Sequence, residues 1–162
     1  MDIDSLRTKY EAIRDEYDRN KASLSWQNMH WEAGYNLQNE ARDIGWKVVP
    51  LINRNTYSDS LPILVNALKE IGTRRAGLLS LEPGAELPWH KDYDEPNDGN
   101  NIVIRVLWGL DVPIQEGRKS FIEFRNGVEI FQNNELVMFS SLEEHRVFNG
   151  LSERRIVVGF DI

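Results

Sequence analysis

The order of apolar and polar positions divides the chain into a helical beginning and a strand-rich remainder. Near the start, apolar residues recur at spacings of three and four, which places them on one face of a helix; they are Ile3, Leu6, Tyr10, Ile13 and Tyr17. A second helix is predicted over residues 61–71, because Pro62 falls in its first turn and Gly72 follows its last residue. A short helical segment is also predicted over residues 38–44.

From Thr73 onward, short apolar runs alternate with turn-forming residues, and this pattern predicts many short strands. The strands are expected at 76–81, 102–110, 120–124, 127–131, 136–139, 145–148 and 154–162. Asn126-Gly127 indicates a hairpin between two of them. The earlier run 46–52 is predicted as an edge strand, because Pro50 has no amide hydrogen for a ladder. Such a series is typical of a β-sandwich, a barrel or a jelly roll.

Length and composition limit the class of protein. A chain of 162 residues fits one domain, here with a helical part at 1–45 and a β core at 46–162. The net charge of −7 argues against nonspecific binding to nucleic acid. The absence of cysteine excludes disulfides and thiolate metal sites and fits a reducing compartment. The charged N-terminus and the lack of a long apolar run predict a cytoplasmic protein without membrane contact, while the oligomeric state is left open.

Histidines offer the first candidate chemistry. In an extended segment, His90 and Asp92 point to the same side, and His145 begins a strand that a jelly roll can bring beside them. Two imidazoles and one carboxylate form the facial triad of nonheme Fe(II) oxygenases. Asp94 is a rival carboxylate on the same side, whereas His30 has no ligand-type residue at a suitable spacing. The other interpretation is a polar loop histidine and a surface histidine without a metal.

Two arginines lie at positions where a charge needs a partner. Arg154 and Arg155 open the last strand and face opposite ways, and Arg105 interrupts an apolar strand. The forked guanidinium suits a carboxylate that binds through both oxygens. A dicarboxylate such as 2-oxoglutarate would supply that group. A salt bridge with an acidic side chain of the same chain is the other interpretation.

Three segments carry a resemblance to a known family: Leu81-Glu-Pro-Gly-Ala-Glu-Leu-Pro-Trp-His90, Ile104-Arg-Val-Leu-Trp-Gly-Leu-Asp-Val-Pro113 and Leu136-Val-Met-Phe-Ser-Ser-Leu-Glu-Glu-His145. Together with Trp46-Lys-Val-Val-Pro-Leu51, they resemble the aspartyl/asparaginyl β-hydroxylase family over about residues 45–162. The resemblance implies a double-stranded β-helix and a dioxygenase that uses Fe(II), 2-oxoglutarate and O2. It also implies His90 and His145 as iron ligands, Arg155 as the residue that binds the tail carboxylate of 2-oxoglutarate, and Arg105 near its other carboxylate.

The chain departs from the family pattern at two positions. Some members have no acidic ligand, but Asp92 is present here, so a full triad of His90, Asp92 and His145 is predicted. The family often has a histidine two residues after the matched arginine, where this chain has Leu107. Members and relatives of the family modify protein side chains, free amino acids or lipid acyl chains.

The predicted function is therefore hydroxylation of an unactivated C–H bond in an amino-acid-like or peptidyl substrate, either a small molecule or a peptide. Two alternatives stay open at this point. One is a non-catalytic cupin-like module that binds a small molecule beside a vestigial metal site. The other is a metal-dependent cupin isomerase or hydrolase, which would need neither 2-oxoglutarate nor an arginine on the last strand.

Overall fold

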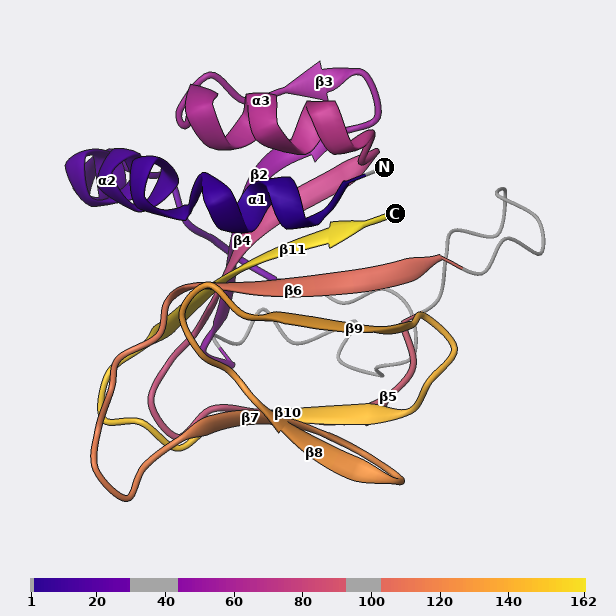
Figure 1. The fold of residues 1–162 in the computed structure, drawn as a ribbon. Helices are drawn as coiled ribbons and strands as arrows, with labels where there is room; N and C mark the ends of the chain where they lie inside the picture. Colours follow the sequence, from indigo (N-terminus) through magenta and orange to yellow (C-terminus); the bar gives the residue numbers. More distant parts are fainter. Residues whose placement is uncertain (1, 30–43, 93–102) are drawn as a thin grey trace.

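A computed structural model describes residues 2–29, 44–92 and 103–162. In these residues, two antiparallel β-sheets face each other, and the helices cover the outer face of the larger sheet (Figure 1). The helices are α1 (Asp4–Thr8), α2 (Tyr10–Asn20), the 3-10 turn η1 (Lys21–Ser23) and α3 (Pro62–Ile71). The predicted helix over 38–44 lies, apart from its last residue, outside the described residues.

The described residues of the larger sheet form seven strands in the order β1-β2-β4-β11-β6-β9, with β3 beside β2. Their bounds are Gln27–Asn28 (β1), Trp46–Asn53 (β2), Thr56–Tyr57 (β3), Arg75–Leu81 (β4), Ile104–Asp111 (β6), Leu136–Ser140 (β9) and Arg155–Asp161 (β11). The smaller sheet has the order β5-β10-β7-β8 among the described residues. Its strands are Glu86–His90 (β5), Ser120–Phe124 (β7), Gly127–Ile130 (β8) and His145–Asn149 (β10). The two sheets confirm the prediction of a mostly β fold with N-terminal helices.

The alternation of side chains along the central strands produces two hydrophobic cores. On β11, Ile156, Val158 and Phe160 face the helices, where they pack in one buried cluster with residues of α1, α2 and α3. Val157 faces the other way, into a second cluster between the sheets. Each face of β11 is therefore buried, and a polar side chain on the inner face of this strand is enclosed by the two sheets.

Two of the predicted elements differ in detail. The first helix is broken at Lys9, whose φ of −94° and ψ of 3° separate α1 from α2, although the apolar stripe still reaches the core. β2 is not an edge strand, because it pairs with β4 on one side and with β1 and β3 on the other. Pro50 lies between the pairings with β1 and β3 and at a register irregularity opposite β4, where its missing amide hydrogen is tolerated.

Other predicted boundaries are confirmed. Pro62 occupies the first turn of α3, and Gly72 ends this helix in the left-handed conformation with a φ of 86°. The β7–β8 hairpin forms around Arg125 and Asn126, with Phe124 and Gly127 as the last paired residues. One strand of the smaller sheet, β5, was not among the predicted strands.

Candidate metal centre

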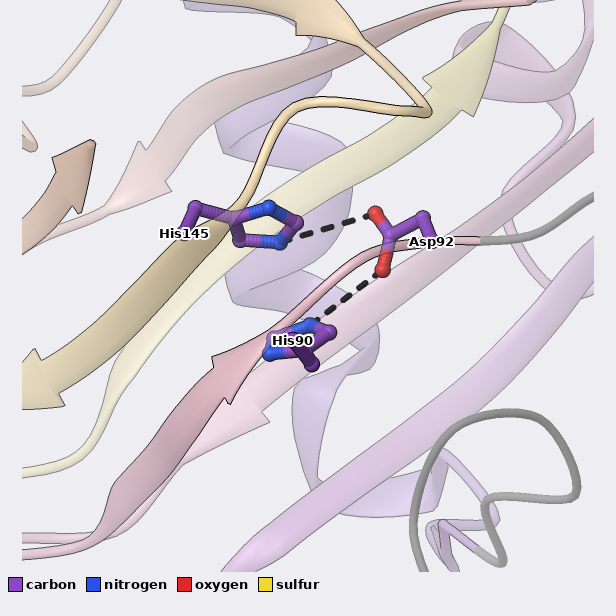
Figure 2. A group of neighbouring side chains, drawn as sticks. All are labelled: His90, Asp92 and His145. Carbon is purple, nitrogen blue, oxygen red and sulfur yellow. Dashed lines mark ion pairs between the residues drawn. The ribbon is translucent and has the colours of Figure 1, made fainter. Parts of the chain in front are cut away.

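His90 and His145 lie side by side because they are partners in the register of β5 and β10. Their ring centroids are 4.2 Å apart. Asp92 follows the end of β5 and turns its carboxylate toward both rings (Figure 2). Its Oδ1 lies 3.2 Å from Nε2 of His90, and its Oδ2 lies 3.7 Å from Nε2 of His145. The ligand atoms of these three buried residues all lie within 4.8 Å of one another.

The backbone fixes which nitrogen of each imidazole faces the carboxylate. Nδ1 of His90 donates to the carbonyl oxygen of Pro88 at 2.7 Å, and Nδ1 of His145 donates to that of Glu143 at 2.9 Å. A neutral imidazole has one donor and one acceptor nitrogen, so Nε2 of each ring keeps its lone pair. Both lone pairs are available beside Asp92, which is the arrangement that a divalent metal ion requires. The donor set of two imidazoles and one carboxylate fits Fe(II).

The charges around the carboxylate keep it ionised. Burial by itself would raise the pKa of Asp92, but the close contact with His90 and the positive charge of Arg105 outweigh that effect and lower it. For His145, burial lowers the pKa despite the opposing charge of Asp92, which favours the neutral ring. An ionised carboxylate and a neutral imidazole are the protonation states in which these groups bind metal.

Arg105 connects the metal-facing carboxylate to the larger sheet. Its Nη1 donates to Oδ2 of Asp92 at 3.1 Å, while Nε and Nη2 donate to the two carboxylate oxygens of Asp161 at 2.8 and 3.1 Å. Arg105 and Asp161 are cross-strand partners in the register of β6 and β11. The guanidinium is therefore shared between two carboxylates, one of which belongs to the His-Asp-His group.

Arg155 is a buried cation on the inner face of the same sheet. Its Nε donates to Oγ of Ser120 at 3.4 Å, its Nη1 donates to the carbonyl oxygen of Leu79 at 3.3 Å, and the guanidinium lies 4.8 Å from the ring centroid of Phe131. Among the described residues, no carboxylate forms an ion pair with it, and burial lowers the pKa of Arg155 to about 9. A desolvated cation without a counter-charge favours an anionic ligand.

The His-Asp-His group and Arg155 line one cavity between the two sheets. Arg105 lies on its wall, and most of the remaining lining is apolar, including Leu107 at the position where the family often has histidine. A ligand in this cavity would meet the three candidate metal ligands and the buried cation together.

All of the polar residues that line this cavity could be named from the sequence. His90, Asp92, His145, Arg105 and Arg155 all line it, and their roles as ligands and cosubstrate contacts stay predictions. Arg154 lies elsewhere, with its guanidinium 5.3 Å from the ring centroid of Trp26. Asp94 and His30 lie outside the described residues.

Asp161, which holds Arg105 but does not line the cavity, is a polar residue to which the sequence assigned no role. Its position on the same face of the last strand as Arg155, opposite Arg105 on the adjacent strand, is the signal that could have indicated it.

The sequence profile of the aspartyl/asparaginyl beta-hydroxylase family matches residues 7–162, nearly the whole chain. The chain belongs to this family. As a member, it is a 2-oxoglutarate-dependent hydroxylase that uses Fe(II), 2-oxoglutarate and O2 to hydroxylate an unactivated C–H bond. Family membership supports this interpretation over a non-catalytic or isomerase-type cupin module. A comparison with curated protein sequences gives no significant match.

Solved structures with little sequence identity share the fold of this family member. A prolyl hydroxylase from Trichoplax adhaerens, in complex with a hypoxia inducible factor peptide fragment, has a TM-score of 0.63 at 13% identity, with 98% of this chain and 78% of that chain covered. A 2OG-Fe(II) oxygenase family oxidoreductase from Burkholderia pseudomallei has a TM-score of 0.60 at 12% identity, covering 91% and 76%. A Pseudomonas putida prolyl-4-hydroxylase has a TM-score of 0.56 at 16% identity, covering 96% and 86%. These likenesses confirm the double-stranded β-helix.

None of the helices in the described parts of the chain is both long enough and apolar enough to cross a membrane.

Proposed function

We propose that His90, Asp92 and His145 hold the Fe(II) of this hydroxylase and that Arg155 binds the tail carboxylate of 2-oxoglutarate. The observation that carries the proposal is the convergence of three ligand atoms within 4.8 Å, in the same cavity as a buried arginine. Bound Fe(II), with 2-oxoglutarate and O2, supplies the chemistry that turns a substrate C–H into C–OH while 2-oxoglutarate is converted to succinate and CO2. The protein residues supply binding, orientation and a dry environment.

The two histidines act as ligands whose rings are held before any metal arrives. The carbonyl groups of Pro88 and Glu143 accept from Nδ1 and so direct each Nε2 toward Asp92. A ligand that is already oriented loses less conformational freedom when it binds. Three protein ligands on one side of an octahedral ion leave three positions for cosubstrate, dioxygen or water.

Arg155 supports the cosubstrate part of the proposal. Its guanidinium is buried, and its partners among the described residues are the neutral groups of Ser120, Leu79 and Phe131. A carboxylate that enters the cavity would find the positive charge already desolvated and oriented. The interaction would be a charge-assisted hydrogen bond in an environment that water scarcely reaches.

For Arg105 we propose a positioning role in addition to its predicted place near the other carboxylate of 2-oxoglutarate. Its contact with Oδ2 of Asp92 leaves Oδ1, which faces His90, for the metal. Asp161 holds the opposite edge of the guanidinium through both oxygens. Outer partners that orient a ligand in this way affect metal affinity strongly.

The substrate that we propose is an amino-acid-like small molecule or a peptide, because the chain belongs to a family that hydroxylates aspartyl and asparaginyl groups. The similar Trichoplax structure holds a peptide fragment, which shows that this fold accommodates one.

Anaerobic addition of Fe(II) and then 2-oxoglutarate tests the proposed function. Wild-type protein should develop a weak visible metal-to-ligand absorption band, because the cosubstrate must bind directly to the ion to produce it. His90→Ala should lose both the band and most of the bound iron, whereas His30→Ala, which removes a histidine outside the predicted site, should keep them. Equal iron content in wild type and His90→Ala would overturn the assignment of the ligands.

A further inference from the structure

A second hollow adjoins the metal cavity on the inner face of the larger sheet. It has a volume of about 280 Å³ and lies over β2, β4 and β11, and we call it the β2 groove. The side chains and glycines that shape it are Trp46, Val48, Pro50, Gly77, Leu79 and Gly159. Its size is close to the lower end of the range for small-ligand sites in proteins.

The β2 groove is continuous with the proposed active site. Trp46, Leu79 and Arg105 line both the groove and the cavity that contains His90, Asp92 and His145. The cavity therefore runs alongside the groove, and a molecule that lies in the groove would lie next to the metal ligands. This continuity assigns the groove to the substrate, which must place its reacting carbon near the metal.

The lining of the groove is mostly apolar, and its polar residues, Asn53, Arg75, Arg105 and Asp161, are gathered where β2 ends. Arg105 and Asp161 are paired there through two hydrogen bonds of 2.8 and 3.1 Å. Val48, Pro50 and Leu79 contribute only hydrocarbon along the middle. A carboxylate or carboxamide placed there would lose hydration without gaining a polar partner, which is unfavourable.

The strand geometry gives the groove an elongated shape. Trp46, Val48 and Pro50 are alternate residues of β2 that line it, and they extend over roughly 13 Å at about 3.3 Å per residue. Gly77 and Gly159 are paired in the sheet beneath them. A Cβ at Gly159 would lie 2.6 Å from Cδ1 of Leu79, so this strip of the floor stays at the level of the backbone.

We infer that the β2 groove binds an extended peptide whose alternate side chains are apolar. This inference rests on the proposed function and narrows its substrate class. An extended peptide presents every second side chain to the same side, at intervals that match the alternate residues of β2. Asp and Asn side chains are poor occupants of the groove, although the family is named for their hydroxylation.

The openness of the groove favours a peptide over a hydrocarbon chain. Pro50 is exposed and Met29 is half-buried at its margin, so one side of the occupant stays in water. A peptide backbone is then hydrated while its apolar side chains are buried, but a hydrocarbon chain would leave half of its surface exposed. The net charge of −7 also disfavours an acidic peptide at long range.

Fluorescence anisotropy with labelled peptides tests the inference without turnover. The protein is loaded with Mn(II), which replaces Fe(II) without supporting oxidation, and with 2-oxoglutarate. A peptide of about seven residues with Leu or Val at alternate positions should bind at least about tenfold more tightly than the matched peptide with Ser at those positions. Equal affinity for the two peptides would overturn the inference, and so would displacement of the apolar peptide by decanoate at a lower concentration than by unlabelled peptide.

Variants that place a negative charge in the groove test the same inference. Val48→Glu and Pro50→Glu should each weaken binding of the apolar peptide by about tenfold, because both add a carboxylate to its contact surface. Val128→Glu adds the same charge on β8, where Val128 is 55% exposed and far from the groove lining, and should leave the affinity unchanged. A similar loss in all three variants would overturn the assignment. Failure of wild type to bind Mn(II) and 2-oxoglutarate would instead contradict the proposed function.

Discussion

Arg105 donates to Asp92 across 3.1 Å, and this contact joins the carboxylate that follows β5 in the smaller sheet to β6 in the larger one. The opposite edge of the guanidinium is occupied by both oxygens of Asp161. The proposed acidic metal ligand is therefore oriented by a charge on another sheet, because its own strand has already ended at His90. Metal affinity should depend on this arginine although it does not touch the metal.

Arg105→Lys should lower the affinity for Mn(II) by about ten- to a hundredfold, as outer-partner substitutions in metal sites commonly do. Lysine keeps the positive charge, but its single ammonium group cannot span Asp92 and Asp161 as the planar fork does. The substitution therefore removes the hydrogen bonds that orient the Asp92 carboxylate and leaves the positive charge beside it nearly unchanged. Isothermal titration of the metal-free protein with Mn(II) measures the effect.

Arg7→Lys is the matched control, because Arg7 forms an exposed ion pair with Glu135 away from the cavity. It should leave Mn(II) affinity unchanged. If Arg105→Lys keeps wild-type metal affinity and instead loses affinity for 2-oxoglutarate, Arg105 acts as the cosubstrate contact that the family resemblance implies, and its positioning role is wrong.

Arg155→Lys should abolish most of the thermal stabilisation that 2-oxoglutarate gives to the Mn(II)-loaded protein. A ligand at about a hundred times its dissociation constant stabilises the folded state by about 2.7 kcal/mol. For a chain of this length, that corresponds to a rise of roughly 5–10 °C in the melting temperature. A lysine at this buried position cannot reproduce the paired hydrogen bonds of a guanidinium with a carboxylate.

Arg154→Lys tests the strand register beside that prediction. Arg154 is the preceding residue and lies over Trp26, outside the cavity lining, so this variant should keep the full shift. Loss of the shift in Arg154→Lys, with retention in Arg155→Lys, would contradict the proposed cosubstrate site. Differential scanning fluorimetry with and without 2-oxoglutarate distinguishes the two outcomes.

The alternation of the last strand separated its residues into two faces, and the family resemblance, through Arg155, indicated which face lies toward the cavity. Val157 and Asp161 lie on the same face as Arg155, and Ile156 and Val158 lie on the other, as a period of two requires. The site residues His90 and His145 were also identifiable, because a histidine beside a carboxylate and a distant strand-edge histidine form a recognised ligand set. The family resemblance supplied the rest of the expected cofactors.

The sequence could not show the partners of Arg105, because they depend on the register between strands. Asp161 lies 56 residues away in the chain and faces Arg105 only because β6 and β11 pair at those positions. β5 was missed since Glu86-Leu-Pro-Trp-His90 is short, contains proline and has no clear alternation. The break at Lys9 was missed because the apolar spacing continues through it.

The ring of His145 should stay neutral, and so able to bind metal, at a lower pH than an ordinary histidine. Burial lowers the pKa of His145 below its usual 6.5, so its Nε2 is still neutral where a solvated imidazole is protonated. An NMR titration of the His145 ring in the metal-free protein, between about pH 5 and 8, should give a midpoint below that usual value. A midpoint above 6.5 would contradict the direction of the shift.

The same shift affects the folding of the metal-free protein. Since the unfolded chain binds a proton at this histidine more readily than the folded protein does, the free energy of unfolding should decrease as pH falls through about 6.5. Asp92 affects the free energy of unfolding in a separate, more acidic pH range. Its lowered pKa gives stability that is present above its usual value of 3.8 and is lost as pH falls further. Urea denaturation at a series of pH values separates the two effects.

Asn149→Ala should lower the free energy of unfolding by about 3 kcal/mol, because the fully buried amide makes three hydrogen bonds in the turn between β10 and β11. Its Nδ2 donates to the carbonyl oxygens of Leu81 and Glu153 at 2.8 and 3.0 Å, and its Oδ1 accepts from the amide of Leu151 at 3.1 Å. Alanine leaves these backbone groups buried without partners. Asn66→Ala on the exposed side of α3 should change stability by less than about 0.5 kcal/mol. This turn connects the strand of His145 to the strand of Arg155. Urea denaturation measures the free energy of unfolding of both variants. If the two values are equal, the turn does not hold the two halves of the site together.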